Sequence, residues 1–213
     1  GLRIRSHSSS VVRVIQFDRT ALNNIEFDDC QIEILGQSGT VNIGVRDAWN
    51  SGDTITQSTV HFINCRWRQI GPHAVAGVSL NKTTANMTCS NWRFINPDIR
   101  TGEYAMRLIG LTDFLVQNPN LASTDPRSAA TCFAAGQDGA TGMDTTGVVM
   151  GGSISTLIGH AVILGGGCSD VHIIWSVISG GYHTSNGQGL VIKNATGGRV
   201  SGWRARSRAT HLA

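Results

Sequence analysis

The chain has 213 residues, of which 40% are hydrophobic and 15% charged, with 26 glycines and four prolines. This length suits one domain or one elongated solenoid, and the composition excludes an intrinsically disordered chain. The net charge of +3 is too small to indicate nucleic acid by itself, and no apolar run reaches the ~18–20 residues of a transmembrane helix.

One eight-residue frame recurs along the chain with a strand-like, apolar pattern. Its successive starts lie 24 to 35 residues apart, a spacing typical of proteins that repeat one supersecondary unit. The two longest intervals contain polar insertions, around residues 50–57 and 137–145. The seven copies are IEFDDCQI from Ile25, VHFINCRW from Val60, MTCSNWRF from Met87, FLVQNPNL from Phe114, GVVMGGSI from Gly147, VHIIWSVI from Val171 and GRVSGWRA from Gly198.

Position 5 of the frame marks a bend between two strands. Positions 1 and 3 are mostly apolar, and so are positions 6 and 8, so the parity of the inward-facing residues changes at position 5. Three asparagines, Asn64, Asn91 and Asn118, occupy this position in successive frames. Asparagine tolerates the left-handed backbone that a sharp bend needs. We expect these side chains to turn inward and to hydrogen-bond into a ladder.

A second short apolar strand precedes each frame, so each coil supplies about three strands. Coils stacked at ~4.8 Å then form three parallel sheets around one core. The sequence predicts an all-β protein, a right-handed parallel β-helix of about seven to eight coils, with residues 1–213 as a single domain and a fragment of a longer chain. The preceding strands begin at Val41, Gly77, Ala105, Cys132, Ala161 and Leu190.

The frame resembles the coils of the pectate-lyase-like right-handed β-helix superfamily, with the pattern apolar-x-apolar-x-Asn-x-x-apolar over residues 25–205. That superfamily includes pectate lyases, polygalacturonases, alginate epimerases and bacteriophage tailspikes, so the resemblance implies the handling of polysaccharides. The catalytic signatures of its enzymes are mostly missing. Gly159–His160 is followed by Ala161 where polygalacturonases have Gly-His-Gly.

The leading functional hypothesis is a tailspike-like or surface-appendage β-helix that recognises a bacterial polysaccharide, with cleavage left open. It would act on a virion surface or outside the cell. Two alternatives stay open: a stand-alone polysaccharide lyase, glycoside hydrolase or epimerase, and a structural rod or adhesin segment without catalysis. We expect no membrane or nucleic-acid partner, no cofactor and no metal.

Two weak catalytic clusters stand out. Glu26, Asp28 and His61 fall on outward positions of the first two frames, where two carboxylates on one strand face lie roughly 7 Å apart, a separation suited to an inverting glycosidase. An ordinary exposed Glu–His contact is the simpler reading. The second cluster is Asp98, Glu103 and Arg107, which could supply a base beside a cation or form only a surface ion pair.

Candidate substrate-binding residues are Trp49, in a polar insertion, and two outward arginines, Arg66 and Arg93. The frame places the other tryptophans in the core instead: Trp67, Trp92, Trp175 and Trp203.

An outward apolar patch on the later coils predicts a partner surface, since soluble monomers rarely leave such a patch wet. Tailspikes that this fold resembles are parallel homotrimers, so we expect a homo-oligomer, a trimer. The patch comprises Leu115, Val148, Met150, Ile174 and Val177. Cys30 and Cys65 share position 6 of neighbouring frames, where either a disulfide or two free thiols would fit, and free thiols are favoured.

Overall fold

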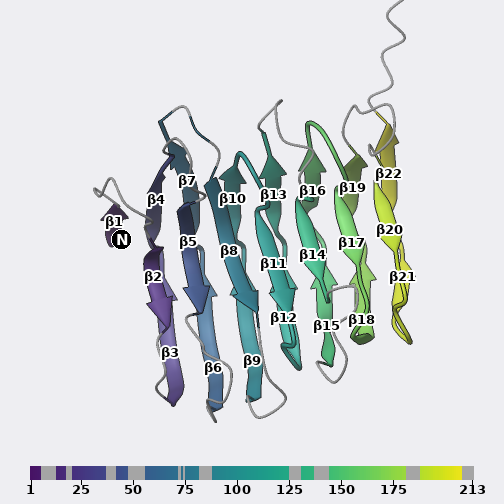
Figure 1. Ribbon diagram of the computed structural model, residues 1–213, viewed down its shortest axis with the longest axis horizontal. Coiled ribbons are helices and arrows are strands. Elements are labelled where there is room, and N and C mark those ends of the chain that lie inside the picture. The colour runs from purple at the N-terminus through teal and green to yellow at the C-terminus, as the bar shows by residue number, and fades with distance from the viewer. Residues whose placement is uncertain are drawn as a thin grey trace, which may run out of the picture.

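The computed structural model describes residues 1–5, 13–17, 21–36, 42–47, 56–71, 73, 75–81, 88–124, 131–136, 144–180 and 188–207. These residues form a right-handed parallel β-helix whose coils follow one another along the long axis of the molecule (Figure 1). All the strands pair in parallel in three sheets, here called A, B and C. The predicted architecture is therefore confirmed.

The three sheets each take one strand from every coil. Sheet A contains β1 (Arg3–Arg5), β4 (Gln31–Leu35), β7 (Arg66–Ile70), β10 (Asp98–Thr101), β13 (Asn120–Ser123), β16 (Ser153–Thr156), β19 (Val177–Gly180) and β22 (Arg204–Ser207). Sheet B contains β2 (Arg13–Phe17), β5 (Asn42–Asp47), β8 (Val75–Asn81), β11 (Met106–Ile109), β14 (Phe133–Ala135), β17 (Val162–Leu164) and β20 (Leu190–Ile192). Sheet C contains β3 (Leu22–Asp28), β6 (Thr56–Ile63), β9 (Thr88–Ile95), β12 (Phe114–Gln117), β15 (Thr145–Met150), β18 (Cys168–Ile174) and β21 (Arg199–Ser201).

Each coil runs from sheet B through sheet C to sheet A, and like residues stack from coil to coil. The aromatic stack shows this register most clearly. The rings of Phe27 and Phe62 lie 4.6 Å apart, and those of Phe62 and Phe94 lie 5.4 Å apart, nearly parallel in both cases. Phe62 and Phe94 are fully buried, so each coil covers the apolar side chains of the next.

The predicted start of the third frame is wrong by five residues. Val60 pairs with Trp92 rather than with Met87, and Phe94 pairs with Val116. The third coil therefore reads WRFINPDI from Trp92, and its bend residue is Asn96 instead of Asn91. Asn91 occupies a different left-handed position, where its side-chain amide donates to the Thr59 hydroxyl over 3.1 Å.

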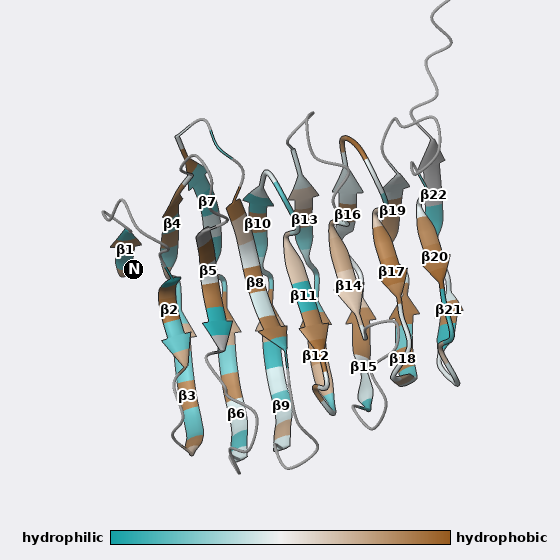
Figure 2. Ribbon diagram, viewed as in Figure 1, coloured by the Kyte–Doolittle hydropathy of each residue, from teal (hydrophilic) through white to brown (hydrophobic). Residues whose placement is uncertain are grey.

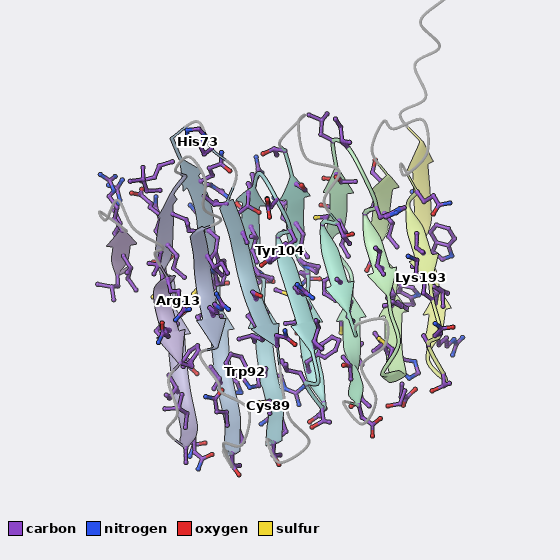
Figure 3. All side chains as sticks on the ribbon, in the orientation of Figure 1. Arg13, His73, Cys89, Trp92, Tyr104 and Lys193 are labelled. Atoms are coloured by element: carbon purple, nitrogen blue, oxygen red, sulfur yellow. The ribbon has the colours of Figure 1, made fainter. Side chains whose placement is uncertain are left out.

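Trp92 on β9, which is labelled in Figure 3, is fully buried as predicted. Its ring packs edge-to-face with that of Phe17, with 5.3 Å between the ring centroids. Trp67 is buried as well. The prediction is wrong for Trp175, which is 75% exposed, and for Trp203, which is 41% exposed. Trp203 does sit at an inward position, but it lies on the last described coil, where no further described coil covers it.

All five cysteines are buried free thiols, as favoured from the sequence. Cys30 and Cys65 lie at equivalent bend positions of neighbouring coils. Burial raises the pKa of Cys65 to about 11, that of Cys132 to about 12 and that of Cys168 to about 11. These thiols therefore act as small apolar core residues and stay protonated.

Candidate functional site

The bend between sheets C and A is the most regular feature of the surface. It contains two residues in all seven described coils, and the first of these adopts a left-handed backbone with φ between 48° and 69°. We call these first residues the bend column: Asp29, Asn64, Asn96, Asn118, Gly151, Trp175 and Gly202.

The asparagines of the bend column form a ladder of the predicted kind, but with Asn96 in place of Asn91, and they face outward. The side-chain amide of Asn96 donates to the Asn64 oxygen over 2.9 Å, and the amide of Asn118 donates to the Asn96 oxygen over 3.3 Å. Asn64 in turn donates to Asp28 over 3.4 Å. All three asparagine side chains are exposed, so the inward orientation expected from the sequence is wrong. The left-handed bend turns position 5 toward solvent while positions 3 and 6 stay buried.

Trp175 continues the bend column after the asparagines. It is the one large aromatic residue in a column that otherwise holds small or polar residues. Its side chain is 75% exposed and its φ is 55°. A left-handed backbone is unfavourable for a bulky residue, so a tryptophan here carries strain of about 1–2 kcal/mol. Such strain at an exposed position is a reason to look for a function.

The indole of Trp175 lies over Gly202 in the next coil. A Cβ atom built on Gly202 would come within 1.9 Å of Trp175 Cδ1, so no larger residue fits beneath the ring. The preceding column residue is Gly151, which lies beneath the Asn118 side chain in the same way. One side of the indole is thus supported by the backbone, and the tryptophan is otherwise open to solvent.

A second polar row runs beside the bend column, on the outer face of sheet A. Asn120 donates its amide to Asp98 over 3.0 Å, and the Ser153 hydroxyl donates to Asn120 over 3.2 Å. Arg66 precedes Asp98 in this row and is exposed. Arg66 also lines a hollow of about 230 Å³ at the first coils, together with Gly1, Leu2, Arg3, Asp29, Cys30 and Gln31.

The first predicted catalytic cluster is partly assembled. Glu26 and His61 lie side by side on neighbouring strands of sheet C, with 3.9 Å between His61 Nδ1 and a Glu26 carboxylate oxygen. Asp28 lies two residues along β3 and accepts the amide of Asn64. Both carboxylates are exposed.

The second predicted cluster is spread over two sheets. Asp98 is on sheet A and Arg107 on sheet B, with Glu103 in the turn between them. Burial alone would raise the pKa of Asp98, but the hydrogen bond from Arg68 and the charges of Arg68 and Arg100 outweigh burial and hold the pKa below its usual value. A carboxylate held this way is a weak general base.

The remaining binding candidates have different surroundings. Arg93 donates to the Asp113 carboxylate over 3.1 Å and to its backbone carbonyl over 3.0 Å. Trp49 lies outside the described residues.

The described residues contain no group of three histidine, cysteine or acidic side chains that could hold a metal ion. Nothing in the described part of the chain is a helix long and apolar enough to cross a membrane. No family model, no curated protein and no solved structure matches this chain.

Trp175 is the main surface residue that sequence reasoning missed as a binding candidate. The sequence places it at position 5 of the frame, where an apolar residue is expected to be buried. The available signal was that the other residues at this position were asparagine, aspartate and glycine, all of which suit an exposed left-handed bend.

Proposed function

We propose that this protein is a polysaccharide-binding β-helix of the pectate-lyase-like, tailspike-like kind, and that a glycan chain binds along the bend column. The observation that carries the proposal is Trp175: a strained, exposed tryptophan, supported by Gly202, in line with a ladder of exposed amides. A protein of this kind would meet its ligand on a virion surface or outside the cell.

The chemistry of a sugar matches both halves of this surface. A pyranose ring has an apolar face of C–H groups, which packs against an aromatic ring, and a rim of hydroxyl groups. The indole of Trp175 is large and rigid, so it provides contact area at a small cost in side-chain entropy.

The amides supply the polar contacts. Each asparagine in the ladder uses one N–H to reach its neighbour, as Asn96 does to Asn64 and Asn118 does to Asn96. An amide has two N–H donors and an oxygen with two lone pairs, so hydrogen-bonding capacity remains for sugar hydroxyls. The row of Asn120 and Ser153 on sheet A lies parallel to the ladder and adds further donors and acceptors.

The geometry favours binding over cleavage. A glycosidase needs two carboxyl groups on either side of one scissile bond. Glu26 and Asp28 lie on sheet C, and Asp98 lies on sheet A in a network of arginines. A polysaccharide on the bend column would therefore be held without a matched acid and base at Trp175.

The test is a binding screen against purified bacterial capsular polysaccharides and lipopolysaccharides, followed by titration calorimetry with Trp175→Asn. Asparagine suits the left-handed backbone, so the variant keeps the fold while it removes the platform. We expect binding to weaken at least about tenfold, and Leu157→Asn, which removes another exposed apolar side chain, to bind as the parent does. Equal binding by Trp175→Asn, or no binding to any glycan, would refute the proposal.

Turnover is checked on the same polysaccharides by release of reducing ends and of unsaturated products. We expect none. If turnover is found, Glu26→Gln, Asp28→Asn and Arg107→Ala locate it. The first two are nearly isosteric changes at exposed positions, and the third removes the cation of the second cluster from a half-buried position.

A further inference from the structure

The outer face of sheet C carries two rows of side chains that run the length of the β-helix. The corrected register of the third coil defines both rows. The first row is Glu26, His61, Arg93, Leu115, Val148, His172 and Arg199. The second row is Asp28, Ile63, Ile95, Gln117, Met150, Ile174 and Ser201.

The middle of this face is apolar and its two ends carry opposite charge. Ile63, Ile95, Leu115, Val148, Met150 and Ile174 are half-buried or exposed, and no described strand packs across them. Figure 2 shows the same gradient, with more hydrophilic colour on β3 than on β12. Glu26 and Asp28 make the first end acidic, and Arg199 makes the last end basic. An apolar centre with a charged rim is the anatomy of a protein–protein interface.

We propose that this face pairs with the same face of a second copy of the chain, with the two β-helices antiparallel. A two-fold axis parallel to the strands, passing over β12, brings each row onto its own reversed copy. Glu26 then faces Arg199 of the other copy. Sheets that pack face to face in this way lie ~10 Å apart, which is close enough for such side chains to meet.

The apolar side chains match under the same operation. Ile63 faces Ile174 of the other copy, and Ile95 faces its Met150. Leu115 and Gln117 lie next to the axis and meet their own counterparts. The second row thus places apolar side chains against apolar side chains when it is reversed, as an isologous interface requires. In the first row His61 faces His172, and Arg93, which is bound by Asp113, faces Val148.

The parallel arrangement of the same two faces is disfavoured by charge. A two-fold axis along the β-helix would place the first row over the second, coil by coil. Glu26 would then face Asp28 of the other copy, and like charges opposite one another in an interface are costly. The charge pattern therefore selects the antiparallel pair.

Arg93 and His172, which also lie on this face, have acidic partners within one chain. Arg93 binds Asp113 over 3.1 Å, and His172 lies 2.8 Å from Asp170. Asp113, which would lie near its own counterpart across the axis, is therefore already paired. Seven strands at ~4.8 Å and a face about four residues wide give a footprint of roughly 30 by 13 Å, about half that of a standard specific interface and in the range of weak, transient ones. We expect a reversible dimer.

The test is sedimentation velocity of the full chain over a wide concentration range, with charge-reversed variants. We expect a dimer of twice 22.7 kDa that dissociates about tenfold more readily in Glu26→Arg and in Arg199→Glu, and that recovers in the double variant. Lys193→Glu makes the same change of charge after β20 on sheet B and is expected to leave the dimer unaltered (Figure 3).

Each outcome decides the proposal. Recovery in the double variant supports the antiparallel pair, because only that pair exchanges the two charges between partners. A tighter dimer in Glu26→Arg overturns it in favour of the parallel arrangement, in which the new arginine would face Asp28. A monomer at all concentrations, a trimer of the kind that the tailspike resemblance implies, or a dimer unchanged by both reversals also overturns it. Circular dichroism confirms that each variant is folded.

Discussion

Trp175 lies across Gly202, and the two residues occupy the same position of successive coils with almost the same left-handed backbone, φ 55° and φ 63°. The glycine adopts this conformation at little cost, whereas the tryptophan does not. The pairing is sterically exclusive, since even a Cβ atom on Gly202 would collide with the indole. An exposed aromatic ring thereby lies directly against the backbone of the next coil.

Replacing Trp175 by asparagine should stabilise the protein. The variant relieves a left-handed backbone that costs a bulky residue about 1–2 kcal/mol, and it loses little apolar burial because the side chain is 75% exposed. We expect the free energy of unfolding in urea to rise by roughly 1 kcal/mol. A fall of similar size would show that the indole contributes packing rather than strain.

The asparagine ladder should be sensitive to the middle residue. Asn96→Ala removes hydrogen bonds to both neighbouring coils and forces alanine into φ 51°, so we expect a loss of about 1–2 kcal/mol. Asn96→Gly removes the same hydrogen bonds, but glycine adopts the left-handed backbone without strain. We therefore expect about half the loss in the free energy of unfolding. Equal losses in the two variants would mean that the backbone conformation contributes nothing.

Stability should fall in acid because of Glu33. Hydrogen bonds from Arg5 and Arg3 hold the pKa of this buried carboxyl below its ordinary value of about 4.5. A carboxyl with a lowered pKa in the folded state stabilises the fold above its ordinary pKa, and this contribution is lost as the pH falls through the folded-state pKa. Thermal melts from pH 6 to pH 2 should show the loss, and Glu33→Gln should flatten the curve below about pH 4.5. A curve with the same slope in the variant would assign the effect to other groups.

The thiols should be inert in the folded protein. With pKa values of about 11 to 12, Cys65, Cys132 and Cys168 carry almost no thiolate at pH 8, and all five cysteines are buried. Iodoacetamide at pH 8 should therefore modify these three only after denaturation, as peptide mass spectrometry would show. Rapid labelling of Cys132 in the native protein would contradict its place in the core.

The architecture could be predicted from the sequence because the same inward-facing apolar positions recur in every coil. The prediction failed at the third coil, where MTCSNWRF and WRFINPDI overlap and both fit the apolar pattern. Which of the two segments is the repeat depends on how β9 pairs with β6. The length of the loop before β9 does not indicate that pairing. An equal spacing of 27 residues favoured the wrong one.

The exposed bend column was harder to predict than the core. A hydrophobic residue at a bend can point either way, and only the backbone conformation at Trp175 turns it outward. The self-complementary rows on sheet C were hidden for a related reason. The shifted third frame places Ser90 where Ile95 stands, which leaves Ile63 as the one apolar residue of this row before Gln117.

The bend from sheet C to sheet A has constant length, whereas the connections at the other two corners of the coil range from three to nine residues. At one corner of the β-helix, equivalent residues of successive coils therefore repeat at a constant spacing of ~4.8 Å. Differences in coil length are confined to the connections at the other two corners. A whole coil could be added or removed without disturbing the spacing of its neighbours along that edge. The number of residues in the bend column would then follow the number of coils at constant spacing, without a change in any single contact between neighbouring coils.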